Sequence, residues 1–155
     1  MDSLTEVYQC EIKPEWVDYN SHLNDAYYAL VFSLAGEALY DALGLGEQWR
    51  QQQNRTIFTL DARTRYLREV HLGAKLTIKA QLLASDSRRM HFLLYMYADD
   101  GKVLRATSEQ VVVCIDPTVT RAAAFDTDAQ QRISDLLQQH LHAAKPATVG
   151  RPLGL

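Results

Sequence analysis

The chain has 155 residues, of which 47% are hydrophobic and 23% are charged, which is typical of one globular domain whose core needs no disulfide support. Its net charge is −3 and its pI is near 5.9. No basic surplus points to a nucleic acid or an anionic membrane, so we expect neither as a partner. The N-terminus lacks a basic region followed by an apolar core, and no apolar run approaches the roughly 18 residues of a membrane span. We therefore expect a cytoplasmic protein.

The first predicted elements are a short strand and a long helix. Residues 5–13 alternate between apolar and polar side chains, and Pro14 ends this strand. A helix is predicted over 24–43, where apolar residues cover most of the cylinder, so we expect it to be buried on several sides. Gly44 ends it, in the position that commonly follows a helix C-cap.

The rest of the chain is rich in strands until a second long helix. After a short helical or irregular stretch at 47–54, strands are predicted over 56–67, 75–84, 90–98 and 103–116. An Asp-Gly pair between the last two is typical of a hairpin. A helix follows over 126–144, with Asp126 as its cap. We expect one domain at 1–144 and a loose, Pro- and Gly-rich tail at 145–155.

This order of elements predicts an α+β fold, in which an antiparallel sheet of about five strands curls around the first helix and the second helix is appended. One subunit leaves that helix partly covered and the sheet edges open. Pairing two subunits edge to edge would relieve both, so we expect a homodimer, or a homotetramer built from it. Cys10 and Cys114 both fall in strands, which favours reduced thiols over a metal or redox site.

The segment WVDYNSHLNDAYY at 16–28 concentrates the residues that could carry chemistry. Asp, Asn and Ser side chains here bond readily to nearby backbone, so they favour turns and helix caps. The segment opens onto the N-terminus of the predicted helix, where outward N–H groups stabilise negative charge. A carboxylate beside such an N-terminus can support attack on a carbonyl group.

This loop, with Asp18, His22, Asn24 and Tyr28 ahead of a long helix, resembles that of the hotdog-fold acyl-CoA thioesterases of the 4-hydroxybenzoyl-CoA thioesterase type. Further matches are RYLREVHLG at 65–73, the turn SRR at 87–89, and Asp99 with GKV at 101–103. The similarity runs from Val7 to Ala123. Among subgroups, the loop is most similar to betainyl-CoA thioesterases of carnitine degradation, except that Ser21 stands where that pattern has a glycine before the histidine.

The resemblance implies that Asp18 attacks the thioester or activates water, although the residues alone equally fit an Asx-turn or a cap. It also implies that the Asp25 N–H polarises the thioester carbonyl. Asn24 can cap the helix at the same time. His22 could carry a proton near neutral pH, but we favour a role in orienting the loop. Asp18, His22 and Asp25 lie within one loop without a ligand motif, so no metal is expected.

Basic and aromatic side chains are the candidates for substrate binding. Arginines suit the phosphates of CoA because of their rigid fork, although they could equally cover the surface. Aromatic faces attract a quaternary ammonium group, although most such rings pack in a core or an interface. The candidates are Arg65, Arg68, Arg88 and Arg89, and the aromatics Trp16, Tyr19, Tyr27, Tyr28 and Tyr66.

The sequence therefore predicts hydrolysis of a short acyl-CoA thioester, with betainyl-CoA as the leading substrate and no metal or redox cofactor. CoA enters as part of the substrate. Two alternatives remain open at this point. One is a thioesterase for aromatic or medium-chain acyl groups, and the other is a non-catalytic module that binds acyl-CoA on the same fold.

Overall fold

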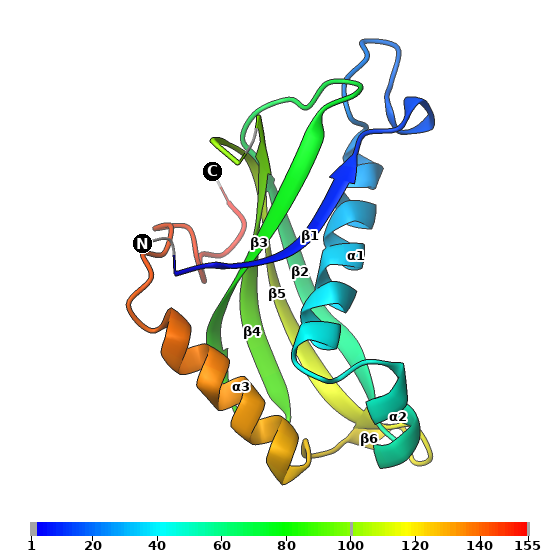
Figure 1. Cartoon of the computed structure of the whole chain (residues 1–155), viewed down its shortest axis with the longest axis vertical. Coiled ribbons are helices and arrows are strands. Elements are labelled where there is room, and N and C mark those ends of the chain that lie inside the picture. Colours follow the sequence, from blue (N-terminus) through cyan, green and yellow to red (C-terminus); the bar gives the residue numbers. More distant parts are fainter. Residues whose placement is uncertain (1–2, 100, 155) are drawn as a thin grey trace.

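The computed structural model describes residues 3–99 and 101–154. Five long strands form one antiparallel sheet in the order β1-β3-β4-β5-β2, and the short β6 (Arg121–Ala122) pairs with β5 (Figure 1). The long strands are β1 (Thr5–Glu11), β2 (Thr56–Tyr66), β3 (Lys75–Ser85), β4 (Arg89–Ala98) and β5 (Val103–Asp116). The helices are the 3₁₀ turn η1 (Pro14–Trp16), α1 (Asp25–Ala42), α2 (Glu47–Gln53) and α3 (Thr127–His140). The predicted α+β hotdog fold is confirmed.

Helix α1 lies against the sheet and forms the core with it (Figure 1). It begins after Asn24, whose side chain accepts the Ala26 N–H at 3.1 Å, and it is followed by Gly44 with φ +69°. Burial on several sides was expected, but the helix buries one broad face. Leu30 and Leu34 on its other side are 39% and 38% exposed. The buried face consists of Tyr28, Val31, Phe32, Ala35, Gly36, Leu39 and Tyr40.

No single helix among the described residues combines the length and the apolar composition of a membrane span. Helices α1 and α2 meet that test only when they are taken together, and they are bent by 63° relative to one another.

Helix α3 covers the part of β3 that β1 does not reach. The pairing of β1 with β3 stops where Thr5 lies opposite Ala80. Beyond it, Nδ1 of the buried His140 accepts the Leu82 N–H at 2.9 Å, and Nε2 lies 3.0 Å from the Thr5 hydroxyl. Burial lowers the pKa of His140, which favours the neutral ring that this acceptor role requires. Helix α3 ends at His140, earlier than the predicted 144, and the residues that follow bond to the sheet instead, where the Gln81 side chain donates to the Ala143 carbonyl at 3.1 Å.

The opposite edge of the sheet is β2, which has β5 on one side and no strand of the described chain on the other. Its side chains are half-buried or exposed along its whole length, and Phe58 and Leu60 are 49% and 59% exposed. This edge presents unpaired backbone groups and apolar side chains together.

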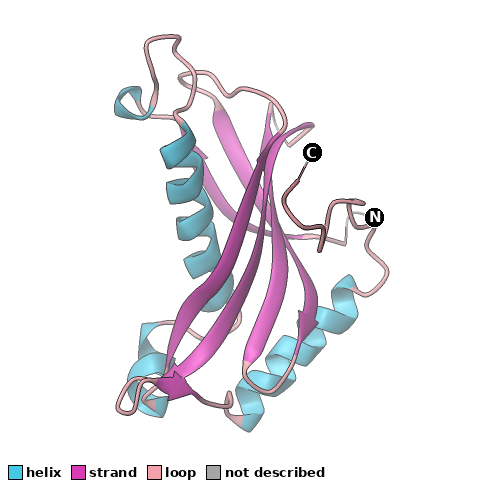
Figure 2. Cartoon of the chain, turned by 180° about the vertical axis from the view of Figure 1, so that it is seen from behind, coloured by secondary structure: helices cyan, strands magenta, loops and turns pink. Residues whose placement is uncertain are grey.

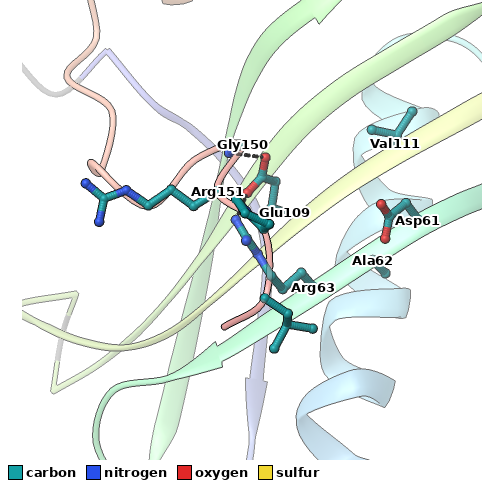
Figure 3. Close-up of a pocket in the computed structure, with 9 residues that line it drawn as sticks. Asp61, Ala62, Arg63, Glu109, Val111, Gly150 and Arg151 are labelled. Carbon is teal, nitrogen blue, oxygen red and sulfur yellow. Dashed lines mark hydrogen bonds and ion pairs between the residues drawn. The ribbon is translucent and has the colours of Figure 1, made fainter. Parts of the chain in front are cut away.

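The C-terminal tail lies on the side of the sheet away from α1 (Figure 2). It was expected to be loose, but its described part is bonded to the sheet. The Gly150 N–H donates to Glu109 at 2.8 Å (Figure 3), and Arg63 donates to the Thr148 carbonyl at 2.7 Å. A cavity of about 370 Å³ lies between the tail and strands β2 and β5. The domain boundary at 144 stays a prediction.

Candidate active site

The loop between β1 and α1 is a tight hairpin. Val17 pairs with Leu23, and the Asn24 N–H donates to the Trp16 carbonyl at 2.9 Å. Inside it, the Asp18 N–H donates to the His22 carbonyl at 2.9 Å. The hairpin thus places Asp18 opposite His22 near the turn, and α1 begins after Asn24, which lies opposite Trp16 at the open end.

The position before the histidine has the backbone geometry of a glycine. Ser21 has φ +58°, in the left-handed region that costs a residue with a side chain about 1–2 kcal/mol. Glycine adopts this backbone conformation without that cost, so Ser21 holds it without the residue that favours it.

The Asp18 carboxylate is oriented by its own turn. Oδ1 accepts the N–H of Asn20 at 2.8 Å and the N–H of His22 at 3.2 Å. Oδ2 forms no hydrogen bond within the described part of the chain. Asp18 therefore forms an Asx-turn, which the residues alone also allowed. Its Oδ2 atom remains available to a substrate or to water.

The N-terminus of α1 offers a backbone donor next to this turn. The Ala26 N–H is shared by Asn24 Oδ1 and Asp25 Oδ1, at 3.1 and 2.9 Å. The Asp25 N–H comes before the first hydrogen bond within the helix, so no helical carbonyl can accept it. It can donate to a negative oxygen, and the helix dipole adds to that preference.

The segment that follows β2 lies beside the hairpin. The Leu23 N–H donates to the Val70 carbonyl at 2.7 Å, and the Leu72 N–H donates to the Ser21 carbonyl at 3.1 Å. Between these bonds, the rings of His22 and His71 meet edge to face, with centroids 4.7 Å apart. The sequence prediction quoted His71 within a motif but gave it no role, because its contact with His22 spans 49 positions.

The predicted aromatic residues form two separate pairs. Trp16 stacks on Tyr27 at 5.8 Å, and the Lys13 ammonium lies 5.3 Å from the Trp16 ring centroid. Tyr28 meets Tyr66 edge to face at 5.0 Å. Neither pair forms a closed box for a cation.

The Tyr28–Tyr66 pair lies beside the 68–71 segment. The buried Tyr28 donates its hydroxyl hydrogen to the Arg68 carbonyl at 3.5 Å. Burial raises the pKa of Tyr28, so it remains a donor. Tyr66 is 54% exposed, whereas Tyr19 on the loop is 96% exposed.

The predicted arginines fall into two groups at opposite ends of the sheet. Arg65 and Arg68 lie at the end of β2 or just after it, on the side of the Asp18 loop. Arg88 and Arg89 follow β3, whose 11 residues separate them from that loop by about 35 Å. The Arg88 carbonyl accepts the Cys114 N–H at 2.7 Å, at the end of the sheet where α2 lies (Figure 1).

The four guanidinium groups differ in their exposure and in whether another residue binds them. Arg89 is held by Asp86 through bonds of 2.8 and 2.6 Å, whereas the exposed Arg88 forms no ion pair with any described residue. The buried Nε of Arg65 also lacks a partner among the described residues. Arg68 and Arg88 are both exposed at a bend, and no described residue binds either guanidinium. Arg68 lies on the side of the Asp18 loop, whereas Arg88 lies far from the Asp18 loop of its own chain.

Two further features concern charge. Glu37 on α1 is paired with Arg50 at 2.9 Å, about three helical turns from the N-terminus of the helix. Within residues 3–99 and 101–154, no three His, Cys, Asp or Glu side chains gather closely enough to hold a metal ion. The expected absence of a metal or redox cofactor stays a prediction.

Known proteins resemble the chain over nearly its whole length. A family model described as the thioesterase-like superfamily matches residues 12–133. Betainyl-CoA thioesterase of Pseudomonas aeruginosa is 36% identical over 155 residues, which are 100% of this chain and 98% of that protein. L-carnitine dehydrogenase/betainyl-CoA thioesterase of Rhizobium meliloti is 27% identical over 93% of this chain, which matches 29% of that longer protein.

Solved structures agree with this. A Staphylococcus aureus protein in complex with CoA superposes with a TM-score of 0.91 at 26% identity, covering 98% of this chain and 95% of the other. A putative thioesterase of Pseudomonas putida KT2440 gives a TM-score of 0.84 at 32% identity, covering 98% and 97%.

Proposed function

The chain belongs to the thioesterase-like superfamily and is an acyl-CoA thioesterase, and we propose that it hydrolyses betainyl-CoA to betaine and CoA with Asp18 as the nucleophile or the general base. The 36% identity to a betainyl-CoA thioesterase over the full chain supports the substrate. The observation that carries the mechanism is the turn of Asp18, which engages Oδ1 twice and leaves Oδ2 free in the loop that leads into α1.

Two routes use this arrangement. In the first, Asp18 Oδ2 bonds to the thioester carbon and CoA leaves as the thiolate, and water then hydrolyses the mixed anhydride. In the second, Asp18 takes a proton from water as that water attacks the same carbon. Both routes develop negative charge on the carbonyl oxygen, which the Asp25 N–H can stabilise.

Substitution of Asp18 by asparagine tests the mechanism. Asp18→Asn keeps the shape of the turn but removes the charge, so kcat should fall by about a hundredfold or more. Release of free thiol measures it. Asp128→Asn, an exposed aspartate in the first turn of α3, serves as the control and should keep wild-type activity. Full activity of Asp18→Asn would refute the mechanism.

The betainyl group carries a trimethylammonium cation, so the proposed substrate needs side chains that bind this cation. The face of Trp16 already carries the Lys13 ammonium, which would compete with a substrate cation. The perpendicular pair of Tyr28 and the half-exposed Tyr66 carries no such cation over either ring among the recorded cation–π contacts of the described residues. We therefore assign the cation to this pair.

A matched pair of substrates tests that assignment. In 3,3-dimethylbutyryl-CoA a carbon replaces the nitrogen of the betainyl group, so shape is kept and charge is lost. Tyr66→Leu should lower kcat/KM for betainyl-CoA by about 2- to 30-fold, the equivalent of 0.5–2 kcal/mol, and leave the neutral substrate unchanged. Equal losses on both would make Tyr66 a packing residue.

The same substrate panel decides between the alternatives. Tyr28 and Tyr66 could also stack on an aromatic acyl group, so benzoyl-CoA and a medium-chain acyl-CoA belong in the panel. Faster hydrolysis of either than of betainyl-CoA would replace the substrate. Binding of all of them without thiol release would identify a binding module.

We propose that two chains complete the site by pairing their β2 edges. A two-fold axis through an antiparallel β2–β2 seam inverts one sheet relative to the other. The end of one sheet that carries Arg88 then lies near the end of the other that carries Asp18. The CoA phosphates would be bound by the partner subunit's Arg88.

Mixing of two inactive variants tests this composite site. If Asp18 and Arg88 come from different chains, random pairing of Asp18→Asn with Arg88→Ala subunits restores about a quarter of wild-type activity at low substrate, since half the dimers gain one intact site. If both residues act within one chain, mixing restores nothing. Separately, Leu60→Lys on the β2 edge should shift the protein toward monomer in size-exclusion chromatography.

A further inference from the structure

We propose that His71 is a positioning residue for thioester hydrolysis, which holds the Asp18 turn in place through the ring of His22. This inference rests on the proposed role of Asp18. It concerns a residue outside the loop, which touches neither Asp18 nor the predicted oxyanion donor.

The contact between the two histidines is set by backbone geometry. The Leu23 N–H bonds to the Val70 carbonyl at 2.7 Å, and the Leu72 N–H bonds to the Ser21 carbonyl at 3.1 Å. These bonds flank His22 and His71, which makes them a non-hydrogen-bonded pair of an antiparallel bridge. Side chains of such a pair lie closest to one another, which accounts for ring centroids at 4.7 Å and an interplanar angle of 79°.

His71 is fixed to the sheet, whereas His22 belongs to the loop. The His71 carbonyl accepts the Ala74 N–H at 3.1 Å, and the Ala74 carbonyl accepts the Ile12 N–H at 3.0 Å. His71 thus begins a turn that is tied to the end of β1. Because His71 is held by the sheet, its ring limits the positions that the His22 ring can take.

His22, the member of the pair in the loop, holds Asp18 in position. The His22 N–H is one of the two donors to Asp18 Oδ1, and the His22 carbonyl accepts the Asp18 N–H. A shift of His22 therefore shifts Asp18 directly. The adjacent Ser21, with φ +58°, stores strain that a loosened bridge would release.

Three substitutions of His71 separate a ring contact from other roles. His71→Ala and His71→Gln both remove the ring, and His71→Phe keeps an aromatic ring that can meet His22 edge to face. A misplaced nucleophile slows the chemical step, so the two ring-less variants should lose about 10- to 100-fold in kcat. Their KM should stay within twofold of wild type, and His71→Phe should recover most of the loss.

The pair should also act as one unit. The double variant His22→Ala/His71→Ala should be no slower than the slower single variant, because each removes the same contact. The exposed His142 lies beyond α3, and His142→Ala is the matched control that should keep wild-type kcat. Far-UV circular dichroism and the unfolding midpoint establish that each variant is folded.

The outcomes distinguish this inference from the proposed function. Retained activity of Asp18→Asn would overturn the proposed mechanism, and the role of His71 with it. If Asp18→Asn is inactive while a folded His71→Ala or His71→Gln has wild-type kcat, only the inference about His71 is overturned. A loss confined to KM, or an equal loss in His71→Phe and His71→Ala, would also overturn it.

Discussion

Glu109 on β5 joins the C-terminal tail to the sheet, and Glu109→Gln is the substitution that tests this junction. Its Oε2 lies 2.5 Å from the Arg63 guanidinium, and its Oε1 accepts bonds from the Gly150 N–H at 2.8 Å (Figure 3) and from His91 at 2.9 Å. Arg63 also donates to the Thr148 carbonyl. Glutamine keeps the size of the side chain but removes the charge that these donors share.

The degree of burial sets the expected loss. The side chains of Arg63 and Glu109 are 18% and 13% exposed, between a surface pair and a buried one. Exposed pairs contribute about 0–1 kcal/mol, and loss of one partner of a buried pair costs about 3–5 kcal/mol. We expect Glu109→Gln to lower the free energy of unfolding by about 2 kcal/mol. The midpoint of thermal unfolding should then fall by about 4–8 °C.

Urea and thermal unfolding at pH 7 and fixed protein concentration measure this loss. Glu37→Gln is the matched control, because Glu37 pairs with Arg50 at 2.9 Å but is 55% exposed, so it should cost less than about 1 kcal/mol. Equal losses in the two variants would refute the view that Glu109 anchors the tail.

The same residue predicts a dependence on pH. Burial alone would raise the pKa of Glu109, but hydrogen bonds from His91, Gly150 and Arg63 together hold it below its usual value of 4.5. A carboxylate with a lowered pKa stabilises the folded state above its unfolded pKa and loses that contribution as the pH falls through its folded pKa. The stability gap between wild type and Glu109→Gln should therefore be constant above pH 5 and shrink below about 4.5.

Two other substitutions test local backbone features by urea unfolding. Ser21→Gly should raise the free energy of unfolding by up to about 1 kcal/mol, because glycine relieves the φ of +58° at some cost in chain entropy; a decrease would show that the side chain supports the loop. Asp126→Ala should lower it by about 1–3 kcal/mol, because Asp126 caps α3 at the Ala129 N–H and also accepts the Trp49 indole N–H at 2.7 Å. A loss below 0.5 kcal/mol would show that water replaces both bonds.

The parts of the fold that the sequence predicts well are those decided by neighbouring residues. Asn24 and Gly44 bracket α1 in the roles assigned to them, because a cap and a left-handed C-terminal residue act within one turn. The four strands after α2 begin and end within one or two residues of their predicted bounds. The 3₁₀ turn at Pro14–Trp16 and the two-residue β6 were too short to leave a periodic pattern.

The features that the sequence did not predict depend on distant partners. Helix α3 ends early at His140, whose ring bonds to Leu82 and Thr5, and the next residues bond to the sheet through Gln81, 62 positions from Ala143. The tail is bonded to Glu109 across 41 positions. Composition marks these residues only as a helical histidine and a glycine in a polar tail, so no local pattern indicates either contact.

The candidate site shows the same difference between contacts of neighbouring residues and contacts of distant ones. The groups proposed for the attack lie within eight consecutive residues, namely Asp18, its two N–H donors and the Asp25 N–H. A resemblance over that single segment can therefore identify them. The other residues proposed for the site come from segments that are remote in the sequence. The Tyr28–Tyr66 pair joins α1 to the end of β2, His71 reaches the loop from beyond β2, and Arg88 lies at the far end of β3. Because the exposed β2 edge is the element that can bring Arg88 of one chain to Asp18 of another, we expect CoA binding to depend on the pairing of chains. The position of Asp18 should instead depend on its own turn and on the His22–His71 contact within one chain.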